Sequence, residues 1–122
     1  MKESAAHHER VARMTFAAVY PMYVEKVLKK GRTEKELQQV IQWLTGLDIK
    51  KQRDLIAKKA SFEVFFGQSS LNPNAQLITG VICGYRIENI ENPLTRKVRY
   101  LDKLVDELAK GRKMEKILRS SS

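Results

Sequence analysis

The stretch that most constrains the fold runs from Asn72 to Leu94 and reads NPNAQLITGVICGYRIENIENPL, the least charged and most apolar part of the chain. Its centre, Leu77 to Tyr85, contains no charged side chain, so we expect this segment to lie in the protein interior. An apolar run of this length fits either a buried strand or a buried helix, because periodicity does not distinguish the two when both faces are apolar.

The composition of this stretch favours a strand, whereas its flanks favour a helix. Ile, Val, Thr and Tyr are frequent in strands. Asn72 is a good N-cap and Pro73 suits the first helical position, where its missing N–H costs nothing. Because Asn92-Pro93 repeats this start signal, we predict a helix from Pro73 to Tyr85.

Two glycines in this stretch, Gly80 and Gly84, are four residues apart. On a helix they would share one face and allow another backbone to approach closely. The alternative is that turns require glycine at both positions.

Apolar residues three and four apart, bounded by capping residues and glycines, predict further helices. Thr33 and Glu36 form a capping box, and Asn92-Pro93 begins the clearest helix of the chain. Pro21 interrupts the first apolar pattern, so we expect two helical pieces there, or one helix starting at Tyr20 or Pro21. The predicted helical segments are 11–30, 33–45, 48–59, 61–67, 93–110 and 114–118.

These elements predict an all-α fold, a compact single-domain orthogonal bundle of about six helices that occupies residues 10–119. We expect the helix over Pro73–Tyr85 to be central, with the helix over Pro93–Lys110 packed along it. Residues 1–9 are predicted to form a disordered tail, and residues 120–122 a frayed one.

The composition excludes several classes of protein. No segment approaches the roughly 18 apolar residues of a membrane span, and the N-terminus lacks the apolar region of a signal peptide, so we expect a cytoplasmic protein without membrane contact. The single cysteine, Cys83, cannot form an internal disulfide, which agrees with a reducing compartment.

The chain is basic, with 23 Lys and Arg against 14 Asp and Glu and a formal net charge of +9. Segment 61–95 is weakly acidic, whereas segment 96–122 is strongly basic, so positive charge surrounds the apolar stretch. A basic surface favours an anionic partner such as nucleic acid or another polyanion. The candidate anion-binding residues are Arg86, Arg96, Lys97, Arg99, Lys103, Arg112 and Lys113.

Arg86 is the only basic residue between Lys59 and Arg96. It has two interpretations: a buried or half-buried ion pair with Glu88, Glu91 or an acid on the long helix, which we favour, or a site for an anionic ligand. The surroundings of Arg86 in the fold distinguish them.

No catalytic residue, metal site or cofactor is predicted. Cys83 lies within the most apolar run, where we expect a buried thiol rather than a nucleophile. Asp102 and Asp106 share a helix face, a spacing that suits a cation but occurs far more often in surface ion pairs. His7 and His8 lie in the predicted tail without further ligands at a metal-binding spacing.

Several blocks of the sequence are distinctive, including Val19-Tyr20-Pro21, Trp43-Leu44-Thr45-Gly46, Leu77-Ile78-Thr79-Gly80, Ile90-Glu91-Asn92-Pro93-Leu94 and Arg99-Tyr100-Leu101-Asp102-Lys103-Leu104. In these blocks the chain closely resembles a family of small bacterial proteins, domain of unknown function 2200. The resemblance covers roughly Val11 to Arg119. It implies a compact, mostly helical fold and no established activity, so no catalytic residue is carried over.

Three hypotheses follow. The first is a non-enzymatic binding module for a polyanion such as nucleic acid, acting through the basic residues of 96–119. The second is a protein–protein adaptor or homodimer with an exposed apolar strip near Trp43 or Tyr100. The third, which we favour least, is an enzyme that uses Arg86, Asp102 or Cys83; it requires these residues to meet at one pocket.

Overall fold

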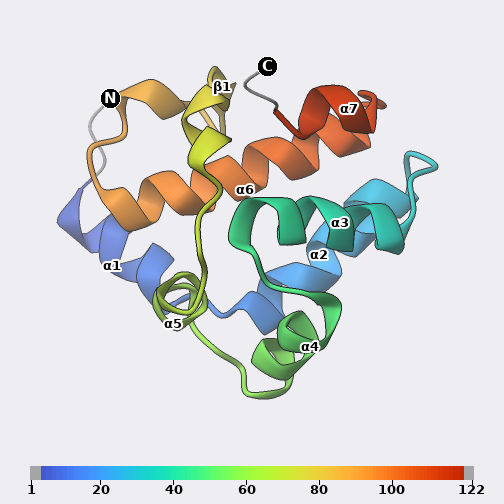
Figure 1. The fold of residues 1–122 in the computed structure, drawn as a ribbon. Coiled ribbons are helices and arrows are strands. Elements are labelled where there is room, and N and C mark those ends of the chain that lie inside the picture. The colour runs from blue at the N-terminus through green and yellow to red at the C-terminus, as the bar shows by residue number, and fades with distance from the viewer. Residues whose placement is uncertain (1–3, 120–122) are drawn as a thin grey trace.

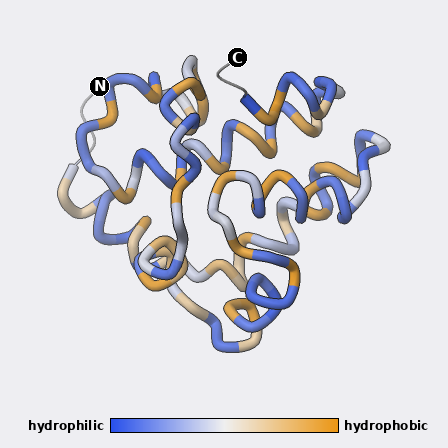
Figure 2. The backbone as a smooth tube through the Cα atoms, in the orientation of Figure 1, coloured by the Kyte–Doolittle hydropathy of each residue, from blue (hydrophilic) through white to orange (hydrophobic). Residues whose placement is uncertain are grey.

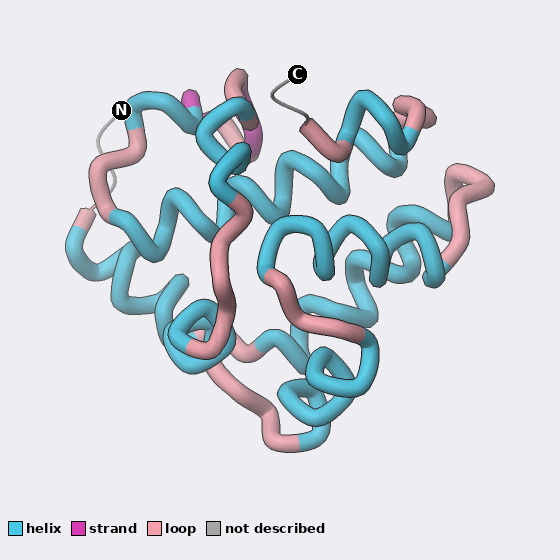
Figure 3. The backbone as a smooth tube through the Cα atoms, viewed as in Figure 1, coloured by secondary structure: helices cyan, strands magenta, loops and turns pink. Residues whose placement is uncertain are grey.

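The computed structural model describes residues 4–119, which form one helical body (Figure 1). Within these residues lie seven α-helices, two 3-10 turns and a two-stranded hairpin, which confirms the all-α prediction (Figure 3). The α-helices are α1 (Ala5–Arg13), α2 (Phe16–Leu28), α3 (Glu34–Thr45), α4 (Ile49–Ala57), α5 (Phe62–Gly67), α6 (Pro93–Ala109) and α7 (Met114–Ile117).

Four helices begin at the predicted capping residues. The side chains of Thr33, Asp48, Ser61 and Asn92 each accept a backbone N–H from the first turn of α3, α4, α5 and α6 respectively. Such a bond satisfies one of the N–H groups that a helix start leaves without a partner. At α3 the capping box is complete, because Glu36 also accepts the N–H of Thr33.

Two predictions about the N-terminal region are wrong. Residues 5–9 belong to α1, which is capped by Ser4, rather than to a disordered tail; residues 1–3 and the predicted frayed end at 120–122 lie outside the described residues. In addition, α2 runs through Pro21 and begins at Phe16, because the Thr15 hydroxyl caps it by accepting the N–H of Ala18. A proline removes one helical hydrogen bond, and here packing of the buried α2 face outweighs that loss.

The stretch from Asn72 to Leu94 does not form the predicted central helix. Pro73–Leu77 is a 3-10 turn (η1), Val81–Ile82 (β1) pairs with Tyr85–Arg86 (β2) in an antiparallel hairpin, and Ile87–Asn89 (η2) is a second 3-10 turn. The segment is also partly exposed rather than interior: Val81 is 50% exposed, whereas Ile78 and Ile87 are buried.

The backbone at the hairpin tip explains this difference. Cys83 and Gly84 have φ values of 55° and 81°, and Gly80 has a φ of 103°. Two consecutive positive φ values in a two-residue loop are those of a type I′ hairpin turn, which a helix cannot contain. The glycines are therefore placed by turns, the alternative that the sequence leaves open.

Replacing Cys83 with asparagine is expected to raise the free energy of unfolding by about 0.5 to 1 kcal/mol, measured by urea denaturation. Asparagine tolerates a positive φ better than cysteine, and Asn-Gly is the preferred pair in this turn. Valine at the same position should lower the stability instead, by about 1 kcal/mol, because a branched side chain is strained there. Equal stability of the two variants would contradict this turn geometry.

The central element is α6, the orange helix that crosses the molecule in Figure 1. It contacts α1, α2, α3, α5, α7, β1 and η2. Its apolar residues alternate with polar ones along the helix, so that one side faces the core while the other carries charge (Figure 2). Val98, Leu101, Leu104, Val105 and Leu108 are all buried.

A second part of the core forms where the starts of α2 and α5 meet. Phe16 and Phe65 are fully buried and stack with their ring centroids 4.3 Å apart. The backbone N–H of Phe16 donates to Ala60 O and that of Phe62 donates to Met14 O, around a bridge between Thr15 and Ser61. The two helix starts are thus fixed to each other through the backbone.

Candidate functional site

A cavity of about 330 Å³ lies between α1, α2 and α6, with one wall from α5. Apolar side chains from all four helices line it, together with polar groups from α1, α2 and α6. Met14 and Met22, both partly exposed, form part of its lining, so the cavity opens to solvent beside them. The lining residues are His7, Arg10, Val11, Met14, Val19, Met22, Tyr23, Phe62, Val98, Arg99 and Asp102.

A chain of polar contacts joins three helices at the edge of this cavity. The Tyr23 hydroxyl donates to Asp102 Oδ1 at 2.6 Å, and Arg99 Nη1 donates to Asp102 Oδ2 at 3.0 Å. Arg99 Nη2 lies 3.2 Å from His7 Nε2, and the Arg99 guanidinium is 5.8 Å from the centre of the Tyr85 ring. The chain therefore links α1 and α2 to α6 and to the hairpin.

This arrangement keeps the Tyr23 hydroxyl protonated and both Asp102 oxygens hydrogen-bonded. Burial, and then the nearby Asp102 carboxylate, raises the pKa of Tyr23 well above its ordinary value, so the hydroxyl remains a hydrogen-bond donor. Each Asp102 oxygen already accepts a hydrogen bond. These hydrogen bonds fix the positions of Tyr23, Arg99 and Asp102 in the cavity wall.

Arg10 differs from the other charged groups that line the cavity. It lies on α1 with an exposed side chain, and within residues 4–119 its guanidinium has no hydrogen bond or ion pair. A guanidinium in this state can bind an anion without first breaking a contact.

Cys83 lies at the hairpin tip and is exposed, so the prediction of a buried thiol is wrong. Partial burial of the thiol, and then the Asp102 charge, raises its pKa above the ordinary 9.0. A thiol needs a lowered pKa to act as a nucleophile at neutral pH. The hairpin therefore places Cys83 near Asp102 in an environment that opposes thiolate formation.

Arg86 forms an exposed ion pair with Glu88, with Nη1 and Oε2 3.6 Å apart. Glu88 also accepts the N–H of Gly80 at 2.7 Å, and this backbone hydrogen bond is the main cause of the lowered pKa of Glu88. Glu88 is one of the predicted partners, but the pair is exposed, at 56% for Arg86 and 41% for Glu88, rather than buried or half-buried as predicted. Arg86, Asp102 and Cys83 do not line one cavity together: among them only Asp102 lines the cavity described above.

Asp102 and Asp106 take part in ion pairs, as the sequence analysis favours. Asp102 pairs with Arg99, and Asp106 pairs with Lys26 at 3.3 Å and Lys110 at 3.0 Å. Burial opposes ionisation of Asp106, but hydrogen bonds from the two lysines outweigh it and lower its pKa. Within the described residues, no three His, Cys, Asp or Glu side chains meet in a group that could hold a metal ion.

The remaining predicted anion-binding residues are spread along α6 and the turn after it. Arg96 donates to Glu88 O at 3.1 Å, Lys103 donates to Val81 O at 3.3 Å, and Arg112 pairs with Glu107 at 3.3 Å. Lys97 and Lys113 make no side-chain contact of this kind within residues 4–119. Most of the predicted set thus already binds groups of the protein itself.

The apolar strip expected for an adaptor is not exposed at either predicted place. Tyr100 is buried, and Trp43 is half-buried and packs against the core. The larger exposed apolar side chains lie elsewhere, including Met22 and Leu28 on α2. No helix in the described part of the chain combines the length and apolarity needed to cross a membrane.

Sequence reasoning did not identify His7, Arg10 and Tyr23 as members of one site. Tyr23 falls within the predicted helical segment 11–30 and His7 within the predicted tail, and neither pattern relates the two residues. The available signal was Ser4, which caps α1 by accepting the N–H of His7 and could have marked a helix start.

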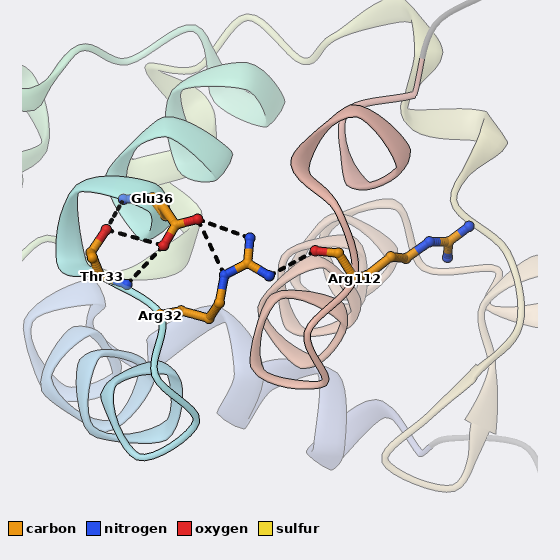
Figure 4. A network of polar contacts seen from close by, with 4 residues as sticks. All are labelled: Arg32, Thr33, Glu36 and Arg112. Carbon is orange, nitrogen blue, oxygen red and sulfur yellow. Dashed lines mark hydrogen bonds and ion pairs between the residues drawn. The ribbon is translucent and has the colours of Figure 1, made fainter.

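A polar network outside the cavity joins the start of α3 to the end of α6 (Figure 4). Arg32 donates to Glu36 Oε2 from Nε at 3.2 Å and from Nη2 at 2.9 Å, and to the backbone carbonyl of Arg112 at 2.8 Å. The guanidinium of Arg112 itself extends away from Arg32 (Figure 4). Arg32 therefore links the loop between α2 and α3 to the turn that leads into α7.

The Glu36 carboxylate is expected to make stability depend on pH. The Arg32 hydrogen bond, followed by that from the Thr33 N–H, lowers the pKa of Glu36 below its ordinary 4.5. A lowered pKa stabilises the fold above the unfolded-state pKa, and this contribution is lost as the pH falls through the folded-state pKa. The fall in unfolding free energy between about pH 5 and pH 3 should therefore be smaller in Glu36→Gln than in the wild type.

The measurement is urea denaturation at several pH values. Glu63→Gln is the control, because Glu63 is exposed on α5 and its side chain makes no hydrogen bond or ion pair within residues 4–119. This control should retain the wild-type pH dependence. Identical profiles for all three proteins would contradict the role assigned to Glu36.

Comparisons with known proteins agree with this fold. The crystal structure of uncharacterized protein SP1917 is 40% identical to this chain and superposes with a TM-score of 0.84, covering 90% of this chain and 91% of that one. A search of curated proteins found no match. The model of the family described as "Uncharacterized protein conserved in bacteria (DUF2200)" matches residues 10–119, and the chain therefore belongs to this family.

Proposed function

We propose that the protein is a non-enzymatic binding module that takes a polyanion such as nucleic acid on the basic surface formed by α6 and the residues after it. The observation that carries this proposal is that single carboxylates form ion pairs with two cationic side chains. In two clusters on α6 a single carboxylate contacts two cationic side chains, so each cluster stays net positive after pairing. They are Asp106 with Lys26 and Lys110, and Glu107 with Arg112 and Arg119.

Shared carboxylates matter because a polyanion competes with them for the same cations. A phosphate that approaches such a cluster meets a net positive field, and the more exposed cation of each pair can turn towards it. In the Asp106 cluster, for example, Lys110 is 73% exposed, whereas Lys26 is 46% exposed. Three further lysines, Lys97 on α6, Lys113 at the start of α7 and Lys116 on α7, add positive charge and make no side-chain hydrogen bond or ion pair within residues 4–119.

A fluorescence anisotropy titration with a labelled DNA duplex and with a single-stranded RNA tests this proposal. Binding is expected at low salt, with an affinity that falls steeply between about 50 and 200 mM salt because released counterions drive the association. No binding at low salt, or binding that salt does not change, would contradict it.

Matched variants locate the surface. The triple variant Lys97→Gln, Lys113→Gln, Lys116→Gln removes three charges from α6 and its C-terminal neighbour, and should weaken binding and reduce the salt slope. The control removes three exposed charges elsewhere, at Lys30, Lys35 and Lys50, and should have a smaller effect. Equal losses in both variants would show that net charge, and not this surface, governs binding.

A further inference from the structure

The cavity between α1, α2 and α6 has the properties of a small-molecule site. Its volume of about 330 Å³ falls at the lower end of the range of ligand pockets, about 300 to 1,000 Å³. Val11, Val19, Phe62 and Val98 form its inner wall and are each at most 4% exposed, whereas Met14 and Met22 in the same lining are 42% and 58% exposed. This apolar lining favours an apolar ligand group.

The charged side chains that line the cavity include more positive than negative groups. Two arginines, Arg10 and Arg99, and one carboxylate, Asp102, line it. Arg99 and Asp102 form an ion pair at 3.0 Å, and their charges cancel to a first approximation. The positive charge of Arg10 is left without a carboxylate among residues 4–119. The lining thus has an excess positive charge beside an apolar interior.

We propose that this cavity binds a small amphipathic anion, a carboxylate with a short apolar tail. The tail lies against Met14 and Met22 and reaches the inner wall at Val11, Val19 and Val98, and the carboxylate binds the Arg10 guanidinium. This assigns a ligand class to the cavity independently of any polyanion bound by the surface of α6 and α7.

The same observations argue against other ligands. A cation would need a carboxylate, but both oxygens of Asp102 already accept hydrogen bonds, from Tyr23 and Arg99. Displacing either donor would leave a partly buried group without a partner, which costs free energy. A neutral apolar molecule fits the walls but leaves Arg10 unused. An apolar tail joined to one anionic group uses both features.

Three probes that share one tail test the proposal on the full-length protein. Octanoate, octan-1-ol and octylammonium differ in the charge of the head group, and acetate carries the charge without the tail. Binding is measured by isothermal titration calorimetry and by chemical shifts of the methyl groups of Val11, Val19 and Val98. Octanoate is expected to bind most tightly, with shifts at these methyls, while octylammonium and acetate bind at least tenfold more weakly.

Arg10→Gln is expected to weaken octanoate binding about five- to tenfold and to leave octan-1-ol binding unchanged, because only the charge-assisted hydrogen bonds are lost. The matched control is Arg13→Gln on the same helix. Arg13 does not line the cavity, and its side chain is 75% exposed and 4.0 Å from Glu9. This variant removes the same charge and should bind octanoate like the wild type.

A second pair of variants tests the cavity opening without disturbing the core. Met22→Glu places a negative charge beside the cavity and should weaken octanoate binding, whereas Leu28→Glu places it on an exposed part of α2 that does not line the cavity. The proposal is overturned if octanoate and octylammonium bind equally, if no valine methyl shifts, or if each cavity variant behaves like its control.

Discussion

Replacing Phe65 with alanine is expected to lower the free energy of unfolding by about 4 kcal/mol, the largest effect predicted for a single substitution in this protein. Phe65 is fully buried and contacts three other aromatic rings, with centroid distances of 4.3 Å to Phe16, 5.0 Å to Phe66 and 6.0 Å to Phe62. Alanine removes these contacts and leaves a void that rigid helices cannot close. Urea denaturation followed by circular dichroism measures the loss.

Two controls make this prediction specific. Val64→Ala changes the preceding residue, which is 46% exposed, and should alter stability by no more than about 0.5 kcal/mol. Phe65→Leu keeps most of the volume and should cost about 1 to 1.5 kcal/mol, so it remains measurable even if the alanine variant does not fold. An alanine variant as stable as Val64→Ala would contradict the assigned packing.

Replacing Glu107 with leucine is expected to lower the free energy of unfolding by about 3 kcal/mol. The Glu107 side chain is only 6% exposed, and both of its oxygens accept hydrogen bonds from Arg119, one of them at 2.7 Å from Nη2. Arg119 is itself only 13% exposed, so the substitution leaves a poorly solvated positive charge without its partner. Urea denaturation at neutral pH provides the measurement.

Removing the partner charges distinguishes an uncompensated buried charge from lost packing as the cause of this destabilisation. Arg112 is 47% exposed, so Arg112→Gln should cost no more than about 1 kcal/mol. The double variant Glu107→Leu, Arg119→Met removes both buried charges and should recover much of the stability lost in Glu107→Leu. A double variant less stable than the single one would show that packing, rather than the uncompensated charge, determines the effect.

The helices could be predicted because their start signals are local. Thr33, Asp48, Ser61 and Asn92 each cap a helix by a bond to a residue two or three positions further along the chain. Such a bond depends little on the rest of the fold, so the residue type and its spacing are sufficient evidence.

The hairpin could not be predicted in the same way. Its conformation depends on a positive φ at Cys83, a residue type that rarely adopts one, and on a contact with α6. In that contact Lys103 on α6 donates to Val81 O, 22 residues away in the sequence. Apolar composition suggested burial, but the hairpin lies on α6 with only part of its side chains covered.

The cavity could not be predicted from local sequence signals either. Its polar groups come from α1, α2 and α6, and Tyr23 and Asp102 are brought to 2.6 Å only by helix packing. His7 lies in the predicted tail of residues 1–9 and was therefore not expected at a site. Asp102 and Arg99 were both named as candidate residues. A site built at a junction of three helices requires the packing to be known first.

The backbone junction between the starts of α2 and α5 has a consequence for the motion of the cavity wall. Met14 directly follows α1, and its carbonyl accepts the N–H of Phe62 next to the aromatic core. The last turn of α1 therefore cannot detach without breaking a bond at the base of α5. This turn should open only together with the core, as one cooperative unit, so that a ligand enters through a preformed opening and not beneath a moving lid.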